Sequence, residues 1–251
     1  MTFEAAVLLT CMAVAAGLVG SFAVMRGMSL AADPLSHVAL PGIGLALALH
    51  SQPIFGAVAA LLVGAVLVWV LEKQAQASTE AIIGVVFSAA LAVGSLTTSG
   101  EQLIDALVGG GGAPGFAEVA FVLVGASAIV LFIVMYRNSL VVTLVSPDIA
   151  RTAGVNVRRL ELLYLLAFAL TIGLGLRFLG VLLMGALIII PAITAKRLAR
   201  NLNEMLLLSV LVAVVAALIG AAIAAWLGLE TGPVIVLIAA TGFAISLLRE
   251  S

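Results

Sequence analysis

Residues 31–42 read AADPLSHVALPG and place an aspartate, a histidine and two prolines in a chain that is 64% hydrophobic. Asp33 and His37 are four residues apart, so on a helix they would share one face, with Cβ atoms about 5–6 Å apart. A carboxylate and an imidazole at this spacing can ligate one divalent cation. We therefore predict a cation site at Asp33 and His37.

The two prolines predict that this segment is not a continuous helix. Proline lacks an N–H group, so Pro34 would free the carbonyl of Leu30, and Pro41 that of His37. At membrane depth such a break is tolerated only where protein or a water-filled cavity satisfies the backbone, which favours a polar path here. The alternative is structural: Asp33 would be the N-cap of a helix that starts at Pro34, and His37 would donate to a neighbouring helix.

The composition predicts a membrane protein. Only 9% of the 251 residues are charged and the mean hydropathy is +1.35, whereas a soluble domain is about 25% charged. Several apolar runs reach the roughly 20 residues that span a bilayer core, and they lack the alternation of barrel strands. We expect an all-α, polytopic transmembrane helical bundle that forms a single domain over residues 1–251. The net charge of −1 and the absence of a basic patch argue against nucleic acid as a partner.

The apolar segments predict eight or nine spans. They lie at about residues 5–25, 30–49, 53–71, 79–98, 116–136, 160–177, 180–195, 205–227 and 232–248. The count falls to eight if either the short segment 180–195 or the interrupted segment 30–49 does not cross.

The basic residues predict the orientation of the spans. With the N-terminus outside, ten of the 11 Lys and Arg residues lie on the cytoplasmic side and only Arg177 lies outside, as the positive-inside rule requires. The outer segments then carry an excess of acidic residues, which could raise the local cation concentration. These are Glu4, Glu101, Asp105, Glu118 and Glu230.

A cytoplasmic segment, SPDIARTAGVNVRR at 146–159, reads as a short helix with clear ends. Ser146 is a good N-cap, Pro147 suits the first helical position, and Asp148 favours the positive end of the helix dipole. Gly154 suits a left-handed C-terminal stop. Ile149 would add an apolar face, so the helix could bind a partner; the alternative is a helix that lies on lipid headgroups.

Taken together, these motifs resemble the permease subunits of the zinc, manganese or iron ABC importer family. The matching stretches are GLVGSFAVMRGMSLAADPLSHVALPGIGLALAL (17–49), SPDIARTAGVNVRRLELLYLLAFALTI (146–172), FLGVLLMGALIIIPAITAKRLAR (178–200) and LETGPVIVL (229–237). One departure is visible, because Val108, Gly109 and Gly110 stand where the family often has Phe-Gly-Asp.

The resemblance implies a metal path through Asp33 and His37, and Glu230 occupies a place where the family often has aspartate. Glu230 could equally be an interfacial carboxylate at the start of a span. Simple topology puts Asp33 near the inner face and Glu230 near the outer face. They can share a site only if the second segment is broken and displaced towards mid-membrane.

The resemblance also implies partners: a cytoplasmic ATP-binding subunit, an extracytoplasmic metal-binding protein and a second permease copy. The two permease copies would form a homodimer in a bacterial-type plasma membrane. The chain would bind no cofactor of its own beyond the transported Zn, Mn or Fe. The residues expected to couple to the ATP-binding subunit are Ser146, Pro147, Asp148, Ala150 and Gly154.

The sequence also bears on two other function classes, a secondary transporter or channel and an intramembrane hydrolase. The only lysines, Lys73 and Lys196, are not part of a phosphate-binding loop, so ATP hydrolysis would come from another polypeptide. A self-contained secondary transporter or channel is the alternative, but it would not need a docking helix. An intramembrane hydrolase is disfavoured, because Ser36 and His37 are adjacent and would point about 100° apart on a helix.

Overall fold

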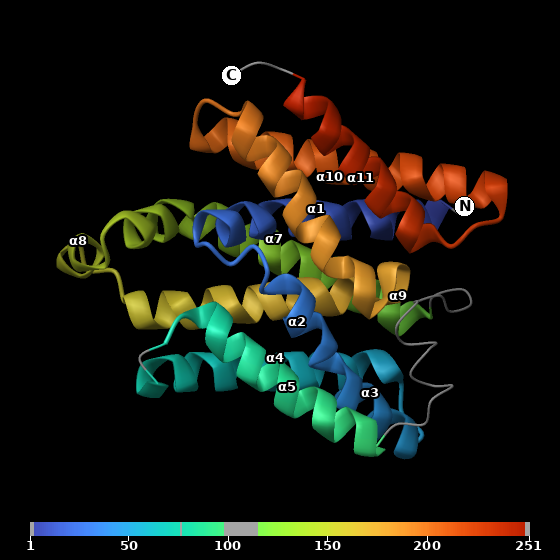
Figure 1. Ribbon diagram of the computed structural model, residues 1–251, viewed down its shortest axis with the longest axis horizontal. Coiled ribbons are helices and arrows are strands. Elements are labelled where there is room, and N and C mark those ends of the chain that lie inside the picture. Colours follow the sequence, from blue (N-terminus) through green and yellow to red (C-terminus); the bar gives the residue numbers. More distant parts are fainter. Residues whose placement is uncertain (1–2, 76, 98–114, 249–251) are drawn as a thin grey trace.

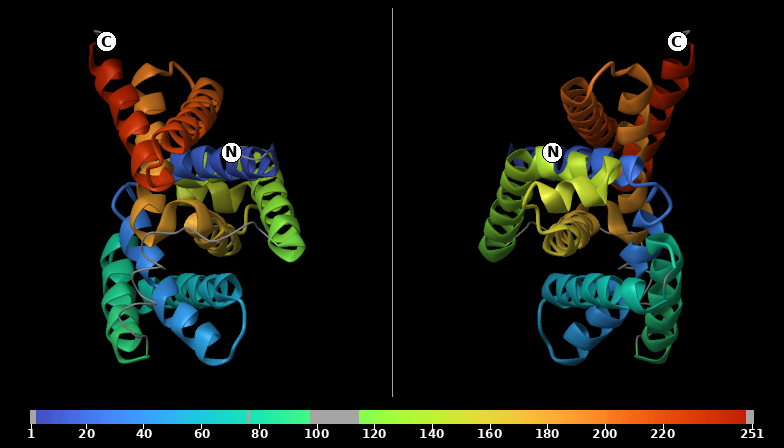
Figure 2. Two further views of the ribbon diagram at one scale, coloured as in Figure 1. Left: turned by 90° about the vertical axis from the view of Figure 1, so that its right-hand side faces the viewer. Right: turned by 90° about the vertical axis from the view of Figure 1, so that its left-hand side faces the viewer.

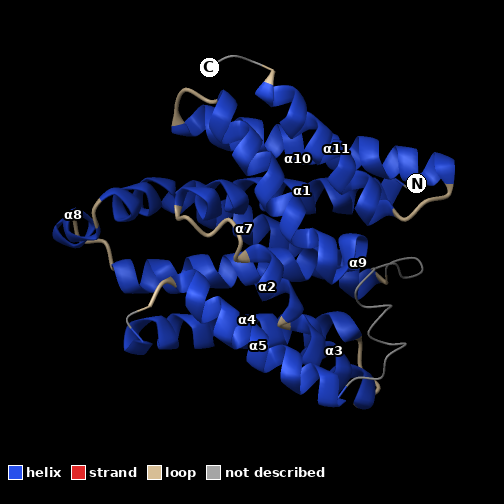
Figure 3. Ribbon diagram, viewed as in Figure 1, coloured by secondary structure: helices blue, strands red, loops and turns tan. Residues whose placement is uncertain are grey.

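The computed structural model describes residues 3–75, 77–97 and 115–248, and each element within these ranges is a helix (Figures 1 and 3). The all-α prediction is therefore confirmed. The helices are α1 (Phe3–Met25), α2 (Ala32–His37), α3 (Ala39–Ala48), α4 (Pro53–Ala75), α5 (Thr79–Thr97), α7 (Phe116–Val145), α8 (Pro147–Thr152), α9 (Val157–Leu198), α10 (Leu202–Leu227) and α11 (Thr231–Leu247).

Within the described ranges, six helical stretches are long and apolar enough to cross a bilayer. They lie in α1, α4, α5, α7, the first part of α9 and α10. The other predicted spans correspond to shorter helices: α2 with α3, the second part of α9, and α11. The multi-pass prediction is confirmed, whereas helix length alone does not establish eight or nine spans.

The bundle has three layers in Figures 1 and 2. Helices α10 and α11 form one layer, α1, α7 and the first part of α9 form the middle one, and α3, α4 and α5 form the third. Helix α8 lies at one end of the bundle, and the N-terminus and the α10–α11 connection lie at the opposite end. We refer to these as the α8 end and the opposite end.

Helix α9 consists of two straight parts that meet at Gly180. This residue has φ 71° and ψ 176°, a conformation that glycine adopts readily and other residues do not. Residues 157–179 run along α1, and residues 181–198 turn back and cross the bundle (Figure 1). The predicted segments 160–177 and 180–195 are thus the two parts of α9.

Glycines let α1 pack against its neighbours at the level of the backbone. A Cβ atom on Gly20 would overlap the carbonyl oxygen of Ile188 in α9, and one on Gly17 would lie 2.8 Å from Cα of Val210 in α10. The Gly17 carbonyl also accepts a 2.8 Å hydrogen bond from the Ser209 hydroxyl. Small residues at such contacts are typical of helix packing in lipid. As a result α1 is the most deeply buried span, with 78% of its apolar window buried against 22% for α5.

The predicted break in the second segment is confirmed, and it falls at Val38. Helix α2 ends at His37 and α3 begins at Ala39. Pro34 and Pro41 each occupy the third position of their helix, where an N–H group has no partner within the helix. Dividing the segment into two short helices therefore removes the cost of a proline inside a longer one.

We predict that Gly20→Ala destabilises the bundle, because the new methyl group would force α1 and α9 apart. Overpacking of this kind costs about 1–3 kcal/mol. The matched control is Gly84→Ala in α5, where an added Cβ would meet nothing within 4 Å. Unfolding of both variants in detergent measures the difference, and equal stability of the two would contradict the packing described for Gly20.

Candidate metal centre and docking helix

Helix α2 carries the predicted cation ligands near the middle of the bundle, between α5 and α9 (Figure 1). The Asp33 side chain is exposed and the His37 side chain is half-buried. The N-cap of α2 is Ala31, so the alternative in which Asp33 caps a helix starting at Pro34 is wrong. Asp33 lies inside the first turn, one turn before His37, as a shared ligand face requires.

The second part of α9 supports α2 from one side. A Cβ atom on Gly185 would lie 3.0 Å from the backbone nitrogen of Asp33 and 3.2 Å from the carbonyl carbon of Ala32. Within α2, the buried Ser36 hydroxyl donates a 2.7 Å hydrogen bond to the carbonyl oxygen of Asp33. The backbone of Asp33 is therefore held closely while its carboxylate stays exposed.

Glu230 lies apart from this pair. It is the exposed N-cap residue of α11, without a side-chain capping bond, at the opposite end of the bundle (Figure 1). Among the described residues, no group of three or more His, Cys, Asp or Glu side chains is placed to hold a metal ion. The second segment is broken and lies near the middle of the bundle, where Asp33 and His37 are one turn apart on α2 (Figure 1). Glu230 lies at the opposite end (Figure 1), so its role as a ligand stays a prediction.

Part of the predicted acidic outer surface cannot be placed. Glu101 and Asp105 lie outside the described residues, as do the backbone positions of Val108, Gly109 and Gly110. The side chain of Glu118 is also outside the described part of the structure.

The predicted docking helix is present as α8, which projects from its end of the bundle (Figure 1). The Ser146 hydroxyl accepts a hydrogen bond from the backbone N–H of Ile149 at 3.4 Å, and Pro147 is the first helical residue. Asp148 pairs with Arg151 at 2.7 Å. Gly154 has φ +80°, so the left-handed stop is confirmed.

The side chains of α8 divide between the bundle and the outside. Ala150 is completely buried, and its carbonyl accepts a hydrogen bond from the backbone N–H of Val155 at 2.9 Å. Ile149 is 60% exposed, and the preceding Val145 is 80% exposed. These two exposed apolar side chains, one at the end of α7 and one on the capped helix α8, are suited to contact with another protein.

A contact between α4 and the first turn of α9 lies close to α8. It joins residues 89 positions apart, so no local pattern in the sequence predicts it. The Trp69 indole N–H donates to the carbonyl of Arg158 at 3.1 Å, and the Arg158 guanidinium lies 4.6 Å from the centre of the Trp69 ring. Asn156 caps the start of α9 by accepting from the N–H of Arg159 at 3.0 Å.

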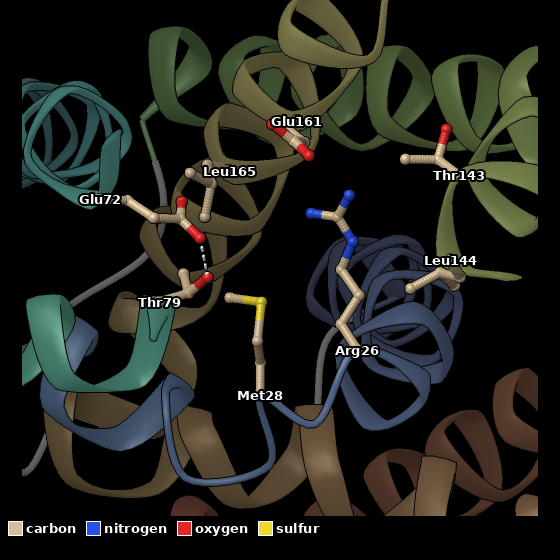
Figure 4. A pocket seen from close by; sticks show the side chains of 8 residues that line it. All are labelled: Arg26, Met28, Glu72, Thr79, Thr143, Leu144, Glu161 and Leu165. Atoms are coloured by element: carbon tan, nitrogen blue, oxygen red, sulfur yellow. Dashed lines mark hydrogen bonds between the residues drawn. The ribbon is translucent and has the colours of Figure 1, made fainter. Parts of the chain in front are cut away.

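A charged cavity of about 200 Å³ lies near the α8 end, and its residues were also missed as a group (Figure 4). In Figure 4 the Arg26 guanidinium points towards Glu161, and Glu72 accepts a hydrogen bond from the Thr79 hydroxyl. The full lining is Arg26, Met28, Glu72, Thr79, Thr143, Leu144, Glu161 and Leu165. In the sequence, Arg26 and Met28 belong to the stretch 17–49 that carries the family resemblance, and no local pattern marks Glu72 or Glu161 as their neighbours.

Arg26, which lines this cavity, also contacts an aromatic ring. Its guanidinium lies 4.5 Å from the centre of the ring of Tyr164, a fully buried residue. The Tyr164 hydroxyl donates a 3.0 Å hydrogen bond to the carbonyl of Val19 in α1. The end of α1 is therefore tied to the first part of α9 through one tyrosine.

Comparisons with known proteins agree with the sequence motifs. Residues 1–250 match the family described as the ABC 3 transport family. The chain is 30% identical over 237 residues to the high-affinity zinc uptake system membrane protein ZnuB of Haemophilus influenzae, covering 92% of this chain and 90% of that protein. It is 28% identical to the manganese transport system membrane protein MntC of Listeria innocua (94% and 85% covered). It is 31% identical to the chelated iron transport system membrane protein YfeD of Yersinia pestis (94% and 80% covered).

The fold is also similar to a solved structure. A chain of PsaBC from Streptococcus pneumoniae, in complex with a Fab, superposes with a TM-score of 0.81 at 29% sequence identity. The match covers 96% of this chain and 89% of that chain.

We predict that Tyr164→Phe lowers the free energy of unfolding by about 1 kcal/mol, the usual net worth of one hydrogen bond. The aromatic ring next to Arg26 would remain, so the decrease in the free energy of unfolding measures only the hydrogen bond to the Val19 carbonyl. Tyr136→Phe is the matched control, because Tyr136 lies 40% exposed on α7. A Tyr164→Phe variant as stable as the control would show that this bond contributes nothing measurable.

Proposed function

The chain belongs to the ABC 3 transport family, and we propose that it is the membrane permease subunit of an importer that carries a divalent metal ion, Zn, Mn or Fe, into the cytoplasm. The named functions of its relatives in zinc, manganese and chelated-iron transport support this class of substrate. The whole chain acts as one permease domain.

The observation that carries the proposal is the placement of Asp33 and His37. An exposed carboxylate midway along an apolar bundle cannot face lipid without a large cost, and intramembrane ionisable residues mark ion pathways by default. Asp33 and His37 therefore face the path and bind the cation in transit. Two ligands are fewer than the four that Zn²⁺ takes, so water, Glu230 or a second subunit completes the coordination.

The energy for transport comes from a separate ATP-binding subunit. The chain has no phosphate-binding loop motif. Helix α8, with its capped ends and its exposed Ile149, is the coupling element, formed by Ser146, Pro147, Asp148, Ala150 and Gly154. The buried Ala150 packs α8 against the bundle. A displacement of α8 by the ATP-binding subunit is therefore transmitted to α7 and α9, which α8 contacts.

The permease works as a pair in a bacterial-type plasma membrane, with metal delivered by an extracytoplasmic binding protein. Two identical chains associate most simply about a twofold axis. The Asp33 carboxylate is exposed on the isolated chain, and a twofold pair can enclose it in a path between the two copies.

The direction of the helices supports nine passes. Following the chain in Figure 1, α1 runs to the α8 end, α2 and α3 run away from it, and the direction alternates through α4, α5, α7, the two parts of α9, α10 and α11. With the α8 end in the cytoplasm, this order puts the N-terminus outside, as the basic residues predict.

We predict that Asp33→Ala and His37→Ala each abolish metal uptake while the protein still inserts and assembles, because each removes one of the two ligands that α2 is proposed to supply. The matched control is His50→Asn: His50 is exposed in the α3–α4 turn with φ 53°, a conformation that asparagine tolerates. Uptake of Zn, Mn and Fe into cells is measured for the two α2 variants and for the His50 control. Normal uptake by both α2 variants would contradict the proposal that Asp33 and His37 coordinate the metal.

We predict that Gly154→Val uncouples ATP hydrolysis from transport but leaves metal binding intact. A β-branched residue resists the left-handed conformation, so α8 would lose its C-terminal stop. The matched control is Gly228→Val. It imposes similar backbone strain, because Gly228 has φ +68°, but it lies at the C-terminus of α10, far from α8 at the opposite end of the bundle. Transport-stimulated ATPase activity that is normal in Gly154→Val, or equally lost in both variants, would contradict α8 as the coupling element.

A further inference from the structure

Helix α2 has no capping group of its own, although it carries both proposed ligands. It is six residues long, and its N-cap, Ala31, offers no side-chain hydrogen bond. A helix of this length is not stable by itself. Its position must therefore come from contacts with neighbouring helices.

Helix α5 supplies a hydrogen bond to the turn just before α2. The Glu80 carboxylate accepts a hydrogen bond from the backbone N–H of Leu30 at 3.2 Å, across 50 residues of sequence. The Leu30 side chain is 76% exposed, so it contributes little packing that could hold this turn. The Glu80 carboxylate therefore anchors the turn that leads directly into Asp33.

The same face of α5 contacts the other end of α2. The Phe87 ring lies 5.5 Å from the His37 ring, centre to centre, with the planes tilted by 51°. Glu80 and Phe87 are seven residues apart, which is about two helical turns, so they point the same way. One rigid helix thus contacts the turn before Asp33 with a carboxylate and the imidazole itself with an aromatic ring.

We propose that Glu80 and Phe87 are positioning residues for the cation site of α2. The inference rests on the proposed role of Asp33 and His37 as ligands. Glu80 sets where the first turn of α2 lies, and Phe87 limits the orientation of the His37 ring. Gly185 of α9 supports the opposite side of α2 through its backbone, so α5 provides the side-chain contacts that select one arrangement of the two ligands.

The physical reason is the narrow geometry that a metal ion demands of its ligands. Groups that orient ligands without touching the metal typically change metal affinity by 10- to 100-fold when they are removed. A freed α2 would still offer a carboxylate and an imidazole, but they would rarely be in place together. We therefore expect weaker binding and altered coordination, not a loss of the folded bundle.

The test uses Glu80→Ala and Phe87→Leu in the complete transporter, purified in lipid nanodiscs, with Co²⁺ as a spectroscopic probe. Glu80→Gln keeps a hydrogen-bond acceptor and should restore most of the affinity. Two controls remove similar contacts elsewhere. Glu204→Ala deletes a carboxylate bond to the backbone N–H of Arg200, 2.8 Å long, and Phe55→Leu deletes the ring contact with Phe121.

We expect Glu80→Ala and Phe87→Leu to weaken Co²⁺ binding by about 10- to 100-fold and to change its visible absorption bands, which report coordination geometry. The half-saturating metal concentration for uptake should rise while the maximal rate changes little, and both controls should match the unmodified protein.

Unchanged affinity and absorption bands in Glu80→Ala and Phe87→Leu, where Asp33→Ala and His37→Ala lose the bands, would overturn the positioning roles and leave the cation site standing. If the Asp33 and His37 variants also bind Co²⁺ normally, both the site and its positioning residues are overturned. Equal losses in the Glu204 and Phe55 controls would show a general loss of stability and would likewise overturn the proposal.

Discussion

The close backbone contact between the second part of α9 and the helices α1 and α2 is the constraint on which the rest of the structure depends. Because Gly20 has no Cβ atom, the carbonyl of Ile188 can lie against it, and the backbone of Asp33 lies against Gly185 for the same reason. In lipid, helices gain little from burying apolar side chains against each other, so close packing supplies much of their association. Gly180, with its positive φ, turns the chain so that residues 181–198 can reach both contacts.

This arrangement keeps a charged helix inside an apolar protein. Helix α2 is too short to be stable alone and is held by α9 on one side and by Glu80 and Phe87 of α5 on the other. Its backbone is therefore satisfied by protein, as the membrane interior requires, while the Asp33 carboxylate remains exposed.

Helix α9 also joins this helix to the α8 end. It contacts both α8 and α2, its first turn is held to α4 by the contact between Trp69 and Arg158, and Tyr164 ties it to α1. Helices α8 and α2, which carry the proposed coupling residues and the proposed ligands, thus both contact α9, whose two parts meet at Gly180. The proposed coupling of ATP hydrolysis to transport would need such a physical connection.

The sequence alone determined the features that depend on local chemistry: the apolar spans, the break near Pro34 and Pro41, and the ends of α8 at Ser146 and Gly154. Each of these follows from hydropathy, from a missing N–H group or from a capping side chain within a few residues. Only the tertiary structure decided that α1 is the most buried of the six candidate spans and that Glu80 holds the turn before Asp33. These depend on which backbones meet across the bundle, because a hydrogen bond between residues 50 positions apart leaves no local pattern in the sequence.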